Sequence, residues 1–261
     1  MRRLLRRIGP IGTIGPILLL LHCGLNTETQ VVTGQISRMM DPPFSSASVI
    51  LGKATVSLPD VAPTPDPWDT SFSAADVPLW LTPTSGATVT VNGVAVPQRI
   101  SGIYFTGMDQ LEFMHPYDLN ILVNDPKFPN AITGHAVLPD SFGITRPMPT
   151  DSLGYDTLRV YWSRSDSAQI YTIEVSPEDT TSRARGYLES LNDTTVLVPK
   201  TAFEDSTGNQ YLPGIYVVMV SAVNGGWKRG IDVLLNGGNV RNAVGIFGAA
   251  TYPAPVRIRL Y

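Results

Sequence analysis

Few side chains in this sequence have the types and spacing that catalysis requires. Beyond the first 22 residues the chain holds two histidines, His115 beside a proline and His135 among alternating apolar residues. It has no Gly-x-Ser-x-Gly turn, which hydrolases of the α/β class use to expose a serine nucleophile. We interpret both histidines as ordinary hydrogen-bonded or surface residues, and we predict no catalytic residue among them.

Carboxylates are more numerous, but their spacing fits no known ligand pattern. The Asp-x-Asp-x-Asp-Gly order of a calcium loop is missing, so we expect solvated loop acids and no metal site. The acidic residues in question are those of a proline-rich stretch, namely Asp60, Asp66, Asp69 and Asp76. A hydrolase with paired carboxylates stays open as an alternative, because distance in space defines such a pair. Its candidates are Glu112, Glu174, Glu189 and Glu204.

A glycine-rich stretch, 225–248, could in principle cradle a phosphate. Phosphate loops of that kind lead from a strand into a helix, and residues 240–244 carry no helical pattern. We predict turns that join short strands here, and no bound cofactor.

Two tryptophans among turn residues are the candidates for contact with a partner. Trp68 follows a proline and Trp227 follows a pair of glycines. Exposed loop tryptophans anchor protein or carbohydrate partners, whereas buried ones close the end of a core. A carbohydrate-binding module is therefore a further alternative, and it requires Trp68 or Trp227 to be exposed beside a groove.

The first 22 residues read as an export signal. Four arginines precede a 14-residue apolar segment, 8–21, which is shorter than the ~20 residues that span a membrane. We predict a signal peptide over 1–22 and no membrane-spanning helix after it. The single cysteine, Cys23, follows directly and excludes a disulfide framework, a cysteine zinc site and an iron–sulfur cluster.

The 261-residue chain has a net charge of −3, and the leader hides a more acidic body. Residues 1–22 hold four of the 19 basic residues and none of the 22 acidic ones, so 15 basic and 22 acidic residues remain, a net of −7. An acidic body without a basic cluster excludes nucleic acid as a partner.

The rest of the chain shows short β-type segments and no long helical period. We predict an all-β protein of two antiparallel sandwich domains, 31–140 and 145–261, after a tether at 23–30.

Alternating residues on both sides of Asn92-Gly93 predict a hairpin over 87–96, because that pair tolerates the positive φ of a type I′ turn. Residues 182–191 fit a helical turn or a strand. The other expected strands are 31–37, 49–58, 103–105, 117–123, 131–138, 156–162, 171–175, 195–198, 214–223 and 256–260.

The second domain resembles a fibronectin type III module. Leu158, Val160 and Trp162 look like its second strand with the buried tryptophan, and Leu212-Pro213-Gly214-Ile215-Tyr216 is similar to its sixth strand. The resemblance implies an immunoglobulin-like sandwich in which Tyr216 ties its strand to the preceding turn. Residues 225–255 depart from the module, and we interpret them as a long insertion.

Cys23 after a leucine run resembles the lipobox of bacterial lipoproteins, in which that cysteine is acylated; His22 departs from the small residue usual there. More widely, the chain resembles exported lipoproteins of unknown function from Gram-negative outer membranes, through 87–91, 117–121 and 242–248. The resemblance implies a lipid anchor at Cys23 and an outer-membrane location. We therefore expect a non-catalytic envelope protein that binds, or supports, envelope proteins or glycans.

Overall fold

The computed structural model is all-β, as predicted. Its strands are accompanied by one 3-10 helix, η2 (Lys200–Phe203), within the described residues. None of the helical structure in this part of the chain is long and apolar enough to cross a bilayer. The described residues are 28–55, 82–109, 111–149, 151–154, 158–179, 182, 184–205, 207–208, 210–225 and 239–261. The predicted signal peptide, the predicted acylation site Cys23 and the candidate contacts Trp68 and Trp227 lie outside them.

The first sandwich packs one part of a large sheet against a five-stranded sheet. Its core contains Val32, Leu51 and Phe247 from the large sheet, and Val89 and Leu119 from the smaller one. Full burial of one such side chain stabilises the fold by about 1.5–3 kcal/mol. The strands of the large sheet here are β1 (Glu28–Met40), β2 (Pro43–Thr55), β3 (Thr82–Pro83), β6 (Gln98–Ile100), β7 (Ile103–Gly107) and β18 (Val244–Tyr252); those of the small sheet are β4 (Thr88–Val91), β5 (Val94–Ala95), β8 (Pro116–Leu122), β9 (Ile132–Val137) and β17 (Val240–Arg241).

Asn92 and Gly93 form the two-residue turn between β4 and β5, with φ of 47° and 79°. This confirms the hairpin that the Asn-Gly pair predicts. The alternation that predicts strand 117–123 is equally plain in β8, whose residues are exposed and buried in turn.

The second sandwich packs the other part of the large sheet against a three-stranded sheet. Trp162 and Tyr216 are both buried in its core, and the Tyr216 hydroxyl donates to the Leu212 carbonyl at 2.7 Å. This is the tyrosine corner that the fibronectin-like spacing predicts. The strands are β11 (Ser152–Leu153), β13 (Ile170–Pro177), β14 (Tyr187–Leu191), β16 (Gly214–Gly225) and β19 (Val256–Leu260), opposite β10 (Ile144–Arg146), β12 (Arg159–Trp162) and β15 (Thr195–Leu197). The segment 182–191, left open between helix and strand, supplies β14.

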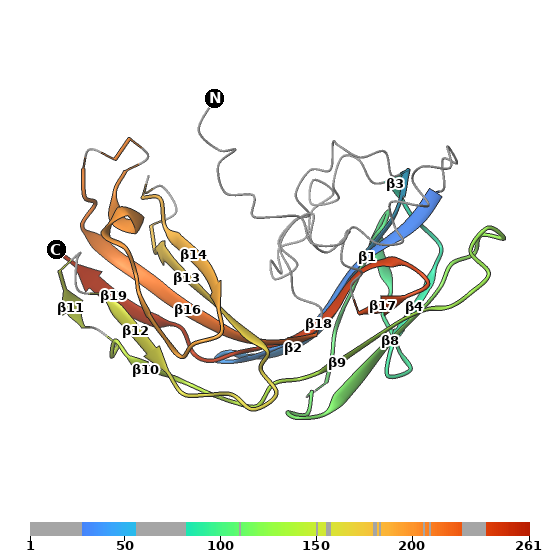
Figure 1. Ribbon diagram of the computed structural model, residues 1–261, viewed down its shortest axis with the longest axis horizontal. Helices are drawn as coiled ribbons and strands as arrows, with labels where there is room; N and C mark the ends of the chain where they lie inside the picture. Colours follow the sequence, from blue (N-terminus) through green and yellow to red (C-terminus); the bar gives the residue numbers. More distant parts are fainter. Residues whose placement is uncertain are drawn as a thin grey trace, which may run out of the picture.

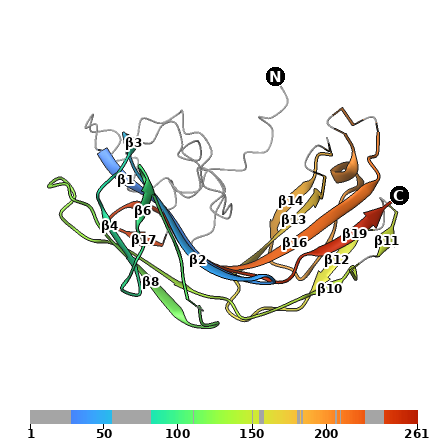
Figure 2. The ribbon, with the colours of Figure 1, turned by 180° about the vertical axis from the view of Figure 1, so that it is seen from behind.

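One continuous sheet runs through both sandwiches. Strand β16 pairs with β13, β19 and the end of β18, and β18 in turn pairs with β1 along its whole length. Figures 1 and 2 show the result as an arc whose two arms share these long strands. The β1–β18 and β11–β19 pairs are parallel, which departs from the antiparallel pattern of the other pairs.

The described part of the glycine-rich stretch builds the first sandwich. From the sequence, 225–255 is predicted to belong to the second domain, as a long insertion of turns that join short strands, yet β17 and β18 supply Val240, Phe247 and Ala249 to the first core. Phe247 fits there because it lies against two glycines on opposite sheets: a Cβ would be 2.8 Å from its side chain at Gly134 and 3.0 Å at Gly34. The chain therefore contributes strands to the first core again after it has formed most of the second core.

Candidate functional site

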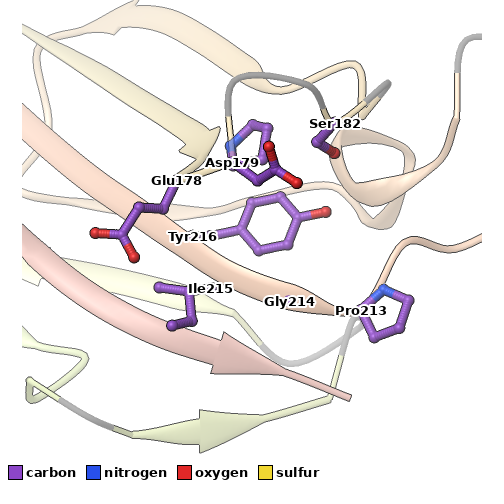
Figure 3. Close-up of a pocket in the computed structure, with 8 residues that line it drawn as sticks. Glu178, Asp179, Ser182, Pro213, Gly214, Ile215 and Tyr216 are labelled. Carbon is purple, nitrogen blue, oxygen red and sulfur yellow. The ribbon is translucent and has the colours of Figure 1, made fainter.

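A pocket lies at one end of the second sandwich, where β13 ends and β16 begins (Figure 3). Its volume is about 500 Å³. Pro177 and Pro213 lie on its walls, and the buried Tyr216 ring forms part of its floor. Loops at the ends of a sandwich are the usual place for ligand contacts, because the sheets hold them rigidly.

Two acidic side chains give the pocket its charge. Figure 3 shows Asp179 beside the Tyr216 ring, whereas the Glu178 carboxyl points away to the side. Glu178 accepts from Arg257 Nε at 2.6 Å, and its backbone N–H donates to the Ile215 carbonyl. The third polar residue, Ser182, accepts through its hydroxyl from the Ala184 N–H at 3.3 Å. The pocket suits a polar or cationic group, and no histidine lines it.

The histidines occupy two separate places on the first sandwich. His135 and Asp118 are cross-strand partners on β9 and β8, with Nδ1 and Oδ1 2.7 Å apart on the exposed face of the small sheet. His115 lies 3.8 Å from Glu112 and edge-on to the Tyr117 ring. In the described part of the chain, no three His, Cys, Asp or Glu side chains are placed to hold a metal ion.

The four carboxylates singled out for a hydrolase do not converge. Glu112 is beside the first core, whereas Glu204 follows η2 in the second sandwich. Glu174 and Glu189 lie on neighbouring strands, but Glu189 pairs with core-facing Ile173 and Glu174 pairs with exposed Leu188. Their side chains therefore leave opposite faces of the sheet. The four loop aspartates lie outside the described residues.

A charged cluster joins the start of β1, the end of β2 and the loop after β8. Lys53 forms an ion pair with Asp125 and lies 5.5 Å from the Phe128 ring centre, and Lys127 pairs with Glu28 at 3.1 Å. The hydrogen bond from Lys53, followed by that from the Lys127 backbone N–H, lowers the pKa of Asp125. The cluster attaches the loop after β8 to strands β1 and β2, and its charged side chains form ion pairs with one another.

The junction between the sandwiches is held by side chains as well as by the shared sheet. Asn224 on β16 accepts from the Val137 N–H at 3.0 Å and donates to the Ser167 carbonyl at 2.6 Å. Thr251 on β18 is buried and donates to the Pro139 carbonyl at 2.7 Å. No sequence motif marks these residues, because their partners are between 57 and 112 positions away.

Comparison with known proteins adds little to this description. No protein-family model matches the chain, and no curated protein matches its sequence. Among solved structures it is similar to one reported for fibronectin(III)-like modules of CbhA from Clostridium thermocellum. The identity is 9%, the match covers 90% of this chain and 93% of that one, and the TM-score is 0.25. At that score the fold assignment depends on the sheets and cores described above.

Proposed function

We propose that this protein is a lipid-anchored, non-catalytic component of the cell envelope with a binding or structural role at the outer membrane. The observation that supports this role best is the continuous sheet, because it fixes two sandwiches and their end loops as one rigid body. Such a body holds binding surfaces at set positions without a moving part. Trp68 and Trp227 remain the proposed partner contacts, with envelope proteins or glycans as partners.

The resemblance to outer-membrane lipoproteins supports the architecture and the location. The resemblance is carried by three sequence segments, which lie in β4, in β8 and at the start of β18. These segments supply Val89, Leu119 and Phe247 to the same core. They are therefore residues that build a sandwich, and they carry no activity with them. The anchor itself depends on Cys23 and the leader before it.

The anchor is tested by metabolic labelling with a fatty-acid probe in a Gram-negative host. The wild-type chain is expected to carry the label and to sediment with outer membranes. Cys23→Ala and Cys23→Ser are expected to lose the label, because the chain has no other cysteine to acylate. Equal labelling of the wild type and both variants would contradict the proposal.

The binding role is tested by affinity capture of the anchored protein in mild detergent, followed by identification of what is retained. Trp68→Ala and Trp227→Ala are compared with Phe44→Ala, which removes an exposed aromatic ring that belongs to no proposed contact. A partner lost only with the tryptophan variants supports the proposed contacts. Retention that is identical in all variants counts against them.

A further inference from the structure

The outer face of the three-stranded sheet carries a cationic and aromatic patch, which we call the β12 patch: Arg146, Arg159, Tyr161 and Leu197. All four side chains are exposed, Tyr161 by 40% and Leu197 by 51%. Strands β10, β12 and β15 contain two arginines and no acidic residue. This contrasts with the net charge of −7 of the chain after its leader.

The register of the strands places these side chains together. Arg146 is the cross-strand partner of Tyr161, which puts their Cβ atoms about 5 Å apart. Arg159 lies two residues before Tyr161 on the same face, about 7 Å away, and its own cross-strand partner is Leu197. Tyr161 therefore has an arginine as a neighbour on the same face in two directions, across to β10 and along β12.

Neither arginine has a neutralising side chain within the described part of the chain. The described residues provide no ion pair and no side-chain hydrogen bond to Arg146 or Arg159, whereas Arg257 on the opposite sheet pairs with Glu178. A shallow pocket of about 340 Å³ opens beside Tyr161, between Thr145 and Arg146. The register shift between Ile144 and Arg146 brings Thr145 to this pocket as well.

We propose that the β12 patch binds an anionic sugar residue of a glycan. Guanidinium groups hold carboxylate or sulfate oxygens through two parallel hydrogen bonds. An exposed tyrosine ring offers a flat apolar surface with a polar edge, which suits the face of a pyranose ring. The pocket volume lies at the small end of the range for ligand sites and accommodates a single sugar. This proposal names a ligand class for the proposed binding role. It rests on the proposed function only for the location of the protein in the cell envelope.

The test is calorimetric titration of the full chain in mild detergent with defined oligosaccharides. The two anionic probes are trigalacturonic acid, which carries carboxylates, and a sulfated galactose trisaccharide. Neutral galactotriose is the control for binding of the sugar ring without a charge. Hexaglutamate is the control for binding of negative charge without a sugar. At least one anionic trisaccharide is expected to bind, with an affinity that falls as salt rises. Which of the two binds identifies the anion.

Arg146→Gln, Arg159→Gln and Tyr161→Ala are each expected to weaken that binding at least tenfold. Arg259→Gln removes the same charge from an exposed position on β19 in the opposite sheet and should leave the affinity unchanged. All these positions are exposed, so thermal unfolding should match the wild type and exclude misfolding as the cause.

Three results would overturn the proposal. One is the absence of binding to both anionic trisaccharides. Another is equal binding of galactotriose, which would remove the role of the charge. The last is that hexaglutamate binds as tightly as the sugars and that Tyr161→Ala does not weaken its binding. That result would point to an acidic peptide as the ligand. Each outcome is read in solution, so it is independent of whether Cys23 is acylated.

Discussion

Trp162 shows how a single side chain defines the second sandwich. It is 4% exposed, its ring centre lies 5.7 Å from that of Tyr171, and its neighbours are the other residues of the second core. Its Nε1 is buried and finds no hydrogen-bond partner among the described residues. The ring therefore stabilises the fold through apolar contact and volume.

Replacing Trp162 tests this directly. Trp162→Ala is expected to lower the free energy of unfolding by about 3–5 kcal/mol, because it removes buried surface and leaves a cavity. Trp162→Phe should cost less, since the indole N–H has no bond to lose. Urea unfolding provides the measurement, with the neighbouring Tyr161→Ala as an exposed control. An unchanged midpoint for Trp162→Ala would remove the core assignment.

Asp125 makes stability depend on pH. Its pKa is lowered by the hydrogen bond and charge of Lys53, helped by the Lys127 backbone N–H. The carboxylate therefore stabilises the fold above the ordinary carboxyl pKa of about 3.9, and that contribution is lost as the pH falls through the lowered value. Asp125→Asn should be less stable than the wild type at pH 7.

The urea midpoints of the two proteins should converge as the pH falls toward 2. Asp109→Asn, which removes a carboxylate from an exposed loop position, serves as the control. A difference between wild type and Asp125→Asn that stays constant from pH 7 to pH 2 would mean that the ion pair does not act as described.

Among the strands, β18 depends on one position where only glycine fits. Gly245 has a φ of 152°, and a Cβ there would lie 1.8 Å from the Val32 carbonyl oxygen, on the strand that β18 pairs with in parallel. A methyl group at this position would force β1 and β18 apart. The same strand carries Phe247, so the effect would reach the first core.

We therefore expect Gly245→Ala to destabilise the protein by about 1–3 kcal/mol or more. The measurement is again urea unfolding, here followed by far-ultraviolet circular dichroism. Gly107→Ala is the matched control, because a Cβ at Gly107 would meet nothing within 4 Å. Equal stability of the two variants would be incompatible with the close approach of β1 and β18.

Strand β8 could be predicted from sequence, whereas β18 could not. β8 alternates buried and exposed residues, so its period of two is visible in the sequence. β18 is buried on both faces from Gly245 to Thr251 and consists of small residues around Phe247. From the sequence such a segment is interpreted as turns between short strands, because neither alternation nor a β-branched run marks it as a long strand.

For the chain as one body, the shared sheet predicts a single unfolding transition. β16 contributes to the second core through Val220 and pairs at its end with β18, which belongs to the first core. Asn224 adds hydrogen bonds to both sides of this junction. Neither sandwich can open without breaking pairs that the other one needs.

Calorimetry should give equal calorimetric and van't Hoff enthalpies for the wild type. Asn224→Ala removes two hydrogen bonds, which costs about 1–3 kcal/mol, and weakens the coupling between the sandwiches. Its transition is expected to broaden or divide. Gln169→Ala, which removes a weaker contact to Gly225 at 3.2 Å, should have a smaller effect. A wild type that unfolds in two separate steps would refute the single body.

The sequence by itself determined the all-β class, the Asn-Gly hairpin and the two core anchors of the second sandwich. Each of these depends on neighbours within a few residues, such as Leu212 and Tyr216, so local spacing suffices. Only the tertiary structure decided that β18 returns to the first core, that Asn224 links Val137 to Ser167, and that Arg146 lies beside Tyr161. These pairs join residues that are far apart in the chain, and strand register, which sets them, is fixed only when both sheets pack.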